Sequence, residues 1–433
     1  MSPPPAFKVA PGINSYDWGK RGSASLAAQY ARESVPDFTI VQDKPYAELW
    51  MGTHPSNPSR TATGLLSEYL AAHPNLIGSK VAHKFPDTRD GALPFLFKVL
   101  SIGTALSIQA HPDKTLASQL HKERPDIYKD PNHKPEMAIA LTPFRAFLNF
   151  VPGPILLQNL ITVPELGDIV PEDAIDKLAK SLGLPTSHDA VDKAAQGPFE
   201  PTTNAQKAAI KAVFSAVMHA TKEQYEGAIE KLVRRYKSGK IAPCEERLRE
   251  LVITLDEQYP ADVGTLCVFL LNVIDLETGQ AVFLGANVPH AYICGDIIEC
   301  MATSDNVVRA GLTPKLRDVP TLVDMLTYEA GPAEKQELQP HEFNRDPTTL
   351  LYDPPIDEFS VLRVHLARDE MTTHRPIEGP SIAIITNGEA LIKWAGSGSI
   401  PVARGDVIFM GAGVEYKWQA TQDTEAFRAF VEA

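Results

Sequence analysis

Apolar and polar positions change their pattern three times along this chain of 433 residues. Up to about residue 152, short apolar runs alternate with turn residues, which is typical of strands. Residues 93–108 predict two strands divided by Gly103, and residues 136–141 and 144–150 predict two more. Residues 65–72 have helical spacing instead. This first region is therefore predicted to be mainly β.

Between residues 153 and 261 the apolar spacing becomes helical. The stripe in residues 175–182 ends at Gly183, a residue that commonly terminates helices. Thr221 and Gln224 form a capping box, the pattern in which two side chains satisfy free backbone N–H groups at a helix start. Further helical stripes lie in residues 210–217, 225–236 and 248–255. The sequence therefore predicts a helical domain inserted into a β protein.

Strand patterns return after residue 261. Residues 265–274 predict a strand, and the turn at residues 277–280 predicts a hairpin with residues 281–284. Beyond residue 332, short strands punctuated by glycines predict a small antiparallel barrel or jelly roll.

The two β regions share a phrase, which we interpret as an internal repeat of one barrel type. Phe283-Leu-Gly-Ala-Asn-Val-Pro-His290 resembles Phe409-Met-Gly-Ala-Gly-Val-Glu-Tyr416. The fold class is thus mainly β with an α insert: two jelly-roll β-barrel regions plus a helical domain. We expect a discontinuous first barrel domain in residues 1–152 and 262–331. The helical insert would span 153–261, and a second barrel 332–433.

Composition narrows the functional classes. Hydrophobic residues make up 44% and charged residues 22%, which is typical of a soluble globular protein. The net charge of −13 argues against nucleic acid or anionic membrane as a partner. None of the four cysteines forms a CxxC pair. No apolar stretch is long enough to span a bilayer, and residues 1–8 lack the apolar core of a signal peptide. We expect a reduced, cytoplasmic protein.

One stretch carries candidate metal chemistry. Ser107, Gln109 and His111 alternate, so on a strand their side chains share one face. Glu136 and His290 lie in later segments able to complete a site with two imidazoles, a carboxylate and an amide oxygen. Isolated histidines on strands more often serve ordinary packing. Spacing alone leaves three further histidines as competing donors: His54, His121 and His133.

Two motifs in the chain are highly specific: Gln109-Ala-His-Pro-Asp-Lys114 and Ser304-Asp-Asn-Val-Val-Arg-Ala-Gly311. They occur together with Tyr16-Asp-Trp-Gly19, Ala47-Glu-Leu-Trp-Met-Gly-Thr-His54, Leu93-Pro-Phe-Leu-Phe-Lys98, Asn132-His-Lys-Pro-Glu136 and Gly285-Ala-Asn-Val-Pro-His-Ala-Tyr292. With these motifs, which cover essentially the whole chain, the sequence resembles the type I phosphomannose isomerases of the eukaryotic kind. The resemblance implies that both β regions are cupin-like (jelly-roll) barrels.

The resemblance implies a function and a set of site residues. The family's zinc ligands fall on Gln109, His111, Glu136 and His290, with one zinc ion per chain, and its catalytic arginine falls on Arg309. The implied reaction interconverts D-mannose 6-phosphate and D-fructose 6-phosphate through a cis-enediol, which would supply mannose 6-phosphate for GDP-mannose, glycosylation and cell-wall polysaccharide. Tyr416 stands where the first barrel has His290, so we expect the second barrel to lack metal.

Other roles stay open at this stage. Glu299 and Lys315 are candidates for the base that removes the C2 proton. Ser107, Lys134 and Lys98 are candidate phosphate contacts, because phosphate is bound by cations and hydroxyl donors.

Trp18 and Glu48 are candidate walls of the sugar pocket. Packing or a salt bridge is the ordinary alternative role for both residues, as it is for each candidate base and phosphate contact. For Arg309 the alternative is a structural ion pair with Asp305. Two alternative functions also remain: an isomerase for another sugar phosphate, or a cupin-type sugar-binding protein without turnover. We expect a monomer.

Overall fold

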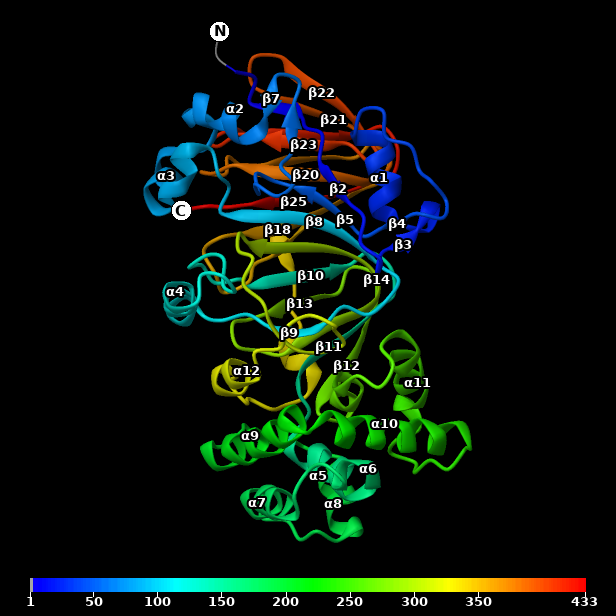
Figure 1. The fold of residues 1–433 in the computed structure, drawn as a ribbon. Helices are drawn as coiled ribbons and strands as arrows, with labels where there is room; N and C mark the ends of the chain where they lie inside the picture. Colours follow the sequence, from blue (N-terminus) through cyan, green and yellow to red (C-terminus); the bar gives the residue numbers. More distant parts are fainter. Residues whose placement is uncertain (1–2) are drawn as a thin grey trace.

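The structure, a computed structural model, describes residues 3–433. Two β regions lie against each other, with a group of helices beyond the first region (Figure 1). Met1 and Ser2, the start of the segment examined for a signal peptide, lie outside the described residues. In the part of the chain that is described, no helix is long and apolar enough to cross a membrane.

The first β region is built on a sheet of ten strands within residues 3–433. Its central strand β14 pairs through its first residues with β9 and β11, and through its later residues with β8 and β10. The ten strands are β2 (Gly12–Asn14), β5 (Glu48–Met51), β8 (Phe95–Ile102), β9 (Ile108–Ala110), β10 (Glu136–Ala140), β11 (Phe144–Phe150), β12 (Leu271–Leu276), β13 (Ala281–Leu284), β14 (His290–Ala302) and β15 (Val308–Gly311).

The second β region consists of two sheets that enclose an apolar cluster containing Trp418 and Tyr416. The larger sheet contains β1 (Ala6–Lys8), β16 (His341–Phe343), β17 (Asp346–Tyr352), β18 (Ser360–Leu366), β20 (Ser381–Asn387), β23 (Val407–Met410) and β25 (Thr424–Phe430). The smaller sheet contains β19 (Met371–His374), β21 (Glu389–Trp394), β22 (Gly398–Ala403) and β24 (Tyr416–Ala420). Strand β1 pairs with β23, so the start of the described chain lies on the C-terminal region.

A helical insertion interrupts the first β region between β11 and β12, and the predicted fold class is confirmed: mostly β with a helical insertion. The insertion contains α5 (Gly153–Thr162), α6 (Pro164–Gly167), α7 (Glu172–Leu182), α8 (His188–Ala194), α9 (Asn204–His219), α10 (Lys222–Lys237) and α11 (Arg249–Gln258). The other helices are α1 (Leu26–Ser34), α2 (Leu66–Ala72), α3 (Ser79–Lys84), α4 (Lys114–Glu123) and α12 (Val319–Met325). Two short ribbons complete the fold: β3 (Lys20–Arg21) with β4 (Pro45–Tyr46), and β6 (Arg60–Thr61) with β7 (Gly64–Leu65). The exact domain boundaries stay a prediction.

Two local predictions after residue 261 are wrong. The predicted strand 265–274 begins as a 3-10 helix, Val263–Phe269, in which every residue is buried, and β12 starts only at Leu271. The predicted hairpin also fails, because β12 pairs with β11 whereas β13 pairs with β10. The turn itself forms, with the N–H of Gln280 donating to the carbonyl of Glu277 over 2.9 Å.

A continuous apolar core joins the helical insertion to the first β region. Buried side chains of α5, α9, α10 and α11 belong to one cluster together with Ile108 and Ala110 of β9 and Val308 and Ala310 of β15. At fully buried positions, apolar contacts of this kind contribute roughly 25 cal/mol per Å². The strands that carry Gln109 and Arg309 therefore share one apolar core with the insertion.

Candidate functional site

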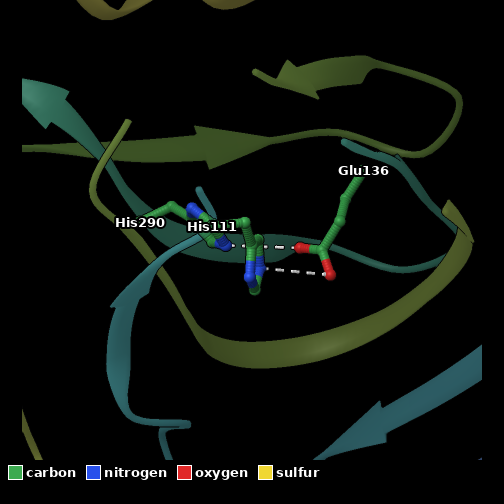
Figure 2. Close-up of side chains that lie close together, drawn as sticks. All are labelled: His111, Glu136 and His290. Atoms are coloured by element: carbon green, nitrogen blue, oxygen red, sulfur yellow. Dashed lines mark ion pairs between the residues drawn. The ribbon is translucent and has the colours of Figure 1, made fainter. Parts of the chain in front are cut away.

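Three of the four predicted metal ligands converge in the first β region. One donor atom from each of His111, Glu136 and His290 lies within 4.8 Å of the others, and all three residues are buried (Figure 2). The Nε2 atom of His111 is 3.4 Å from Oε1 of Glu136, and that of His290 is 3.2 Å from Oε2. Both Nε2 atoms and Oε2 of Glu136 are buried without a hydrogen-bond partner.

The backbone fixes both imidazoles in the state that a metal requires. The Nδ1 atoms face main-chain carbonyls, that of His111 at 2.7 Å from Asn306 and that of His290 at 3.0 Å from Val288. Protonated Nδ1 atoms donate to these carbonyls, which leaves the Nε2 lone pairs free. Burial lowers the pKa of His111 to about 4, so this imidazole is neutral at physiological pH. The residues present therefore fit a divalent metal.

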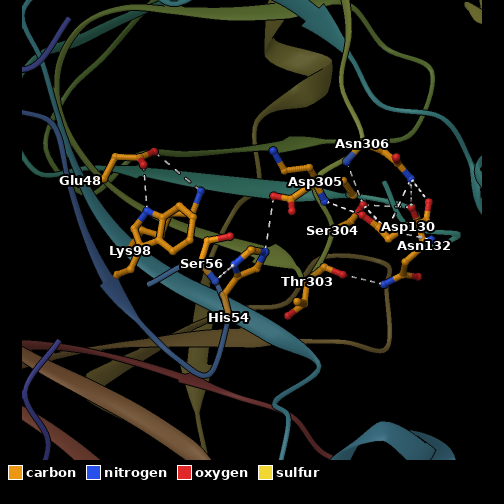
Figure 3. Close-up of polar contacts among 12 residues, drawn as sticks. Glu48, His54, Ser56, Lys98, Asp130, Asn132, Thr303, Ser304, Asp305 and Asn306 are labelled. Carbon is orange, nitrogen blue, oxygen red and sulfur yellow. Dashed lines mark hydrogen bonds and ion pairs between the residues drawn. The ribbon is translucent and has the colours of Figure 1, made fainter. Parts of the chain in front are cut away.

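Two asparagines from the sequence motifs hold the loops behind these ligands. Asn306 donates its side-chain N–H groups to the carbonyls of Asp130 and Asn132 over 2.7 and 2.9 Å (Figure 3). Asn287, at a positive φ of 61°, donates its own backbone N–H to the carbonyl of His111 over 2.7 Å. Its side chain also donates to Asp113 over 2.9 Å. These contacts explain why asparagine follows Ser304-Asp and precedes Val-Pro-His290.

Gln109, the fourth predicted ligand, lies beside this cluster. It is directly opposite His290 on β14 and opposite Arg309 on β15. Only residues 108–110 of the predicted 107–111 stretch form the strand β9, so Ser107 and His111 flank it. The register nevertheless places Gln109 between the metal cluster and the predicted catalytic arginine.

A cavity of about 620 Å³ extends from the cluster, and Glu136 is part of its wall. Every predicted catalytic and substrate residue lines it, so residues far apart in the sequence meet in one place. They are Trp18, Glu48, Lys98, Ser107, Lys134, Glu299, Arg309 and Lys315, and the predicted metal ligand Gln109 lines the cavity as well.

A buried charge network forms one side of this cavity. The ammonium of Lys98 is 2.7 Å from Oε2 of Glu299. It is also 3.9 Å from Oε1 of Glu48, a contact drawn in Figure 3. Burial by itself lowers the pKa of Lys98, but these two carboxylates raise it above its ordinary value. Burial also raises the pKa of Glu299, which brings this carboxyl nearer to neutrality.

Lys134 lies at the metal end of the cavity. Its ammonium is 3.2 Å from Oε1 of Glu136. Burial opposes the ionisation of Glu136, yet Lys134 and His111 hold the pKa of this carboxyl well below its ordinary value. The carboxylate is therefore ionised and ready to bind a cation.

Arg309 is an unpaired cation of the cavity wall. Burial lowers its pKa, and no carboxylate within residues 3–433 forms a salt bridge with it. Asp305, the alternative partner considered from the sequence, lies 3.5 Å from Nε2 of His54 instead (Figure 3). The guanidinium is thus free to meet an anionic ligand.

The three competing histidines have other partners. His54 faces Asp305, and His133 lies 2.6 Å from Glu358. Nδ1 of His121 is 2.8 Å from the carbonyl of Tyr128. None of them belongs to the metal cluster found among the described residues.

Sequence reasoning missed several residues of the cavity wall. Asp17 lies inside a quoted motif, and Tyr292 lies two residues after His290, a spacing that places both on one face of a strand. Gln258 and Tyr259 also line the cavity although they come from the end of α11. Nothing in the local pattern distinguishes these two from an ordinary helix end.

Comparison with known proteins agrees with this geometry. Sequence models of phosphomannose isomerase type I match the chain as catalytic domain at residues 6–153, helical insertion domain at 186–271 and C-terminal region at 349–397. A mannose-6-phosphate isomerase of Cryptococcus neoformans is 62% identical over 433 residues, covering 99% of this chain and 100% of the relative. That of Saccharomyces cerevisiae is 43% identical, with 98% of each chain covered.

Solved structures show the same fold. Mannose 6-phosphate isomerase from Salmonella typhimurium in its apo form has 29% identity and a TM-score of 0.78 over 100% of both chains. A zinc-bound mannose 6-phosphate isomerase has 28% identity and a TM-score of 0.76 over 99% of this chain and 100% of its own. This chain therefore belongs to the family of type I phosphomannose isomerases, the mannose-6-phosphate isomerases.

Proposed function

We propose that this chain interconverts D-mannose 6-phosphate and D-fructose 6-phosphate through a cis-enediol intermediate, with zinc held by Gln109, His111, Glu136 and His290. The observation that carries the proposal is the set of unpartnered donor atoms of His111, Glu136 and His290 next to a cavity that also holds Arg309 and Glu299. A bound zinc ion supplies fixed positive charge at this end of the cavity.

The isomerisation transfers a proton from C2 to C1 and another between O1 and O2. Negative charge grows on these oxygens as the C2 proton leaves, and a permanent cation nearby stabilises it. Arg309 has no carboxylate competing for its guanidinium, so we assign this role to it. We keep Glu299 and Lys315 as candidate bases, and the raised pKa of Glu299 favours the carboxyl.

Substrate contacts follow from the remaining wall residues. Ser107 and Lys134 are proposed to bind the phosphate. Lys98 suits this role less well, because Glu299 and Glu48 already engage its ammonium. Trp18 and Glu48 would then form the wall beside the sugar.

We further propose one zinc ion per chain, because the second barrel carries a cation of its own. Strand pairing identifies the equivalent positions. In the repeated phrase, Met410 corresponds to Leu284. Glu136 is opposite Leu284 in the first barrel and Ser381 is opposite Met410 in the second, so Ser381 stands in the place of Glu136. Likewise Gln109 is opposite His290, and His374 is opposite Tyr416.

In the second barrel, Ser381, His374 and Tyr416 thus stand in the places of Glu136, Gln109 and His290. The guanidinium of one arginine lies against all three. Arg428, which is fully buried, donates to Oγ of Ser381 over 2.7 Å and lies 3.3 Å from Nδ1 of His374. Its guanidinium carbon is 5.4 Å from the ring centre of Tyr416. A fixed positive charge at this place disfavours a metal cation, which supports the prediction that the second barrel binds no metal.

The cellular setting completes the proposal. All four cysteines, which lie within the described residues, are free thiols, and this supports a reducing compartment such as the cytoplasm. There the enzyme would supply mannose 6-phosphate for GDP-mannose, glycosylation and cell-wall polysaccharide. The monomeric state stays a prediction.

A coupled assay on mannose 6-phosphate tests the function. Turnover should vanish after chelation and return with zinc, and metal analysis should find one ion per chain. Turnover that persists in protein shown to be free of metal would refute the zinc role. An inactive, folded, zinc-loaded protein would favour another sugar phosphate or a binding protein.

A further inference from the structure

The end of the helical insertion holds the backbone of the cavity wall. The backbone N–H of Ala105 donates to Oε1 of Gln258 over 3.0 Å, and the hydroxyl of Tyr259 donates to the carbonyl of Ala105 over 2.6 Å. Two consecutive side chains of the insertion therefore satisfy both polar backbone groups of one buried residue. About 150 residues of sequence separate the two sides of this contact.

Ala105 belongs to a segment with no regular structure of its own. Residues 103–107 connect β8 to β9, and Thr104, Leu106 and Ser107 all line the cavity. The backbone N–H groups of residues 103 and 104 donate to the carbonyl of Trp18, and that of Leu106 donates to the carbonyl of Tyr292. Ala105 lies between the residues bonded to Trp18 and the residue bonded to Tyr292, and the insertion holds it through Gln258 and Tyr259.

Three residues later, the same stretch holds a second segment of the cavity wall, next to β15. One carboxylate oxygen of Asp262 accepts the N–H groups of Gly264 and Leu312 over 2.7 and 2.6 Å, and the other accepts that of Thr313 over 3.2 Å. Leu312 and Thr313 line the cavity between Arg309 and Lys315. A Cβ atom added to Gly264 would be 2.6 Å from the N atom of Leu312, so the two backbones are in close contact here.

We propose that residues 258–262, which we name the exit segment, position the two cavity walls, with Gln258 and Tyr259 acting on Ser107 and Asp262 acting on Arg309 and Lys315. The inference rests on the proposed function, and it gives the helical insertion a role in catalysis without contact to the reacting atoms. Buried side chains of α11, β9 and β15 belong to one apolar core, which supports this connection. These are positioning residues, because they act through other side chains.

Tyr259→Phe is the sharpest test, because it removes one hydroxyl and keeps the ring. We expect kcat/KM for mannose 6-phosphate to fall about three- to tenfold, the range that corresponds to loss of one hydrogen bond. The zinc content should stay at the wild-type value. The thermal midpoint should fall by about 2–4 °C, because the same hydrogen bond contributes to stability, and the variant should remain folded at the assay temperature. Tyr225→Phe is the matched control: Tyr225 is a partly buried ring of the insertion that packs against Arg317 and does not line the cavity.

A double-mutant cycle separates positioning from general destabilisation. Tyr259→Phe and Ser107→Ala should be non-additive in kcat/KM by about threefold or more, whereas Tyr225→Phe and Ser107→Ala should be additive. Asp262→Asn provides a second variant, with an expected loss of kcat at unchanged zinc content.

The outcomes distinguish this inference from the proposed function. Wild-type protein that does not turn over mannose 6-phosphate refutes the proposed function itself. If the wild type is active, any of three results overturns the positioning role. The first is an unaffected Tyr259→Phe variant, and the second is an additive Tyr259/Ser107 cycle. The third is a loss of activity that only follows a lower thermal midpoint.

Discussion

Replacing Lys98 with methionine should destabilise the protein strongly, apart from any effect on catalysis. Lys98 is 5% exposed, and its ammonium lies between the buried carboxylates of Glu299 and Glu48. Methionine fills a similar volume but leaves two buried anions without their cation. Breaking a buried ion pair in this way costs about 3–5 kcal/mol. That is a large part of the roughly 5–15 kcal/mol that stabilises a typical domain.

Urea denaturation followed by tryptophan fluorescence measures this effect, since Lys98 lies 5.4 Å from the ring centre of Trp50. The matched control is Lys84→Met, because Lys84 pairs with Asp357 over 3.1 Å at the exposed surface. Exposed pairs are worth about 0–1 kcal/mol. The double variant Lys98→Met/Glu299→Gln should recover much of the loss. If Lys98→Met costs no more than Lys84→Met, the buried network does not stabilise the fold as we argue.

Three further changes have defined outcomes. His290→Ala should lose bound zinc and turnover together, and normal zinc by metal analysis would contradict the ligand assignment. Arg309→Ala should keep zinc and the thermal midpoint but lower kcat about 10²- to 10³-fold, as loss of a charge-stabilising donor does; a near wild-type kcat would refute its role. Burial raises the pKa of Glu245, but hydrogen bonds from Arg235 outweigh this and lower it below the ordinary 4.5. The ionised carboxylate therefore stabilises the insertion above about pH 4.5, and this stabilisation is lost as the pH falls. Between about pH 5 and pH 3.5, the thermal midpoint should consequently fall more in the wild type than in Glu245→Gln.

Local signals in the sequence predicted some of the helices, namely α2, α7, α9, α10 and α11. The capping box forms as expected, with the backbone N–H of Thr221 donating to Oε1 of Gln224 over 2.9 Å, and Gly183 ends α7 in the left-handed conformation. These features depend only on residues within one turn. A sequence window is therefore enough to find them.

Predictions failed where the tertiary environment decides. Residues 263–269 are buried on all sides, so their apolar run carries no periodicity that separates a strand from a 3-10 helix. Similarly, a turn at residues 277–280 is compatible with a hairpin. Here the turn instead joins β12, which pairs with β11, to β13, which pairs with β10. Pairing partners distant in sequence leave no local trace.

The same distinction applies to the site. Residues proposed to bind the metal or the sugar must have particular side chains, and their motifs stand out: Gln109, His111, Glu136 and His290 are all recognisable. Residues that hold the walls in place need only a hydrogen-bonding group at the right point in space. Tyr259 follows a helix end and Asp262 precedes a turn, where such residues are common for local reasons. Their effect on Ala105 and Leu312 exists only because the insertion packs against β9 and β15, and so the structure is needed to see it.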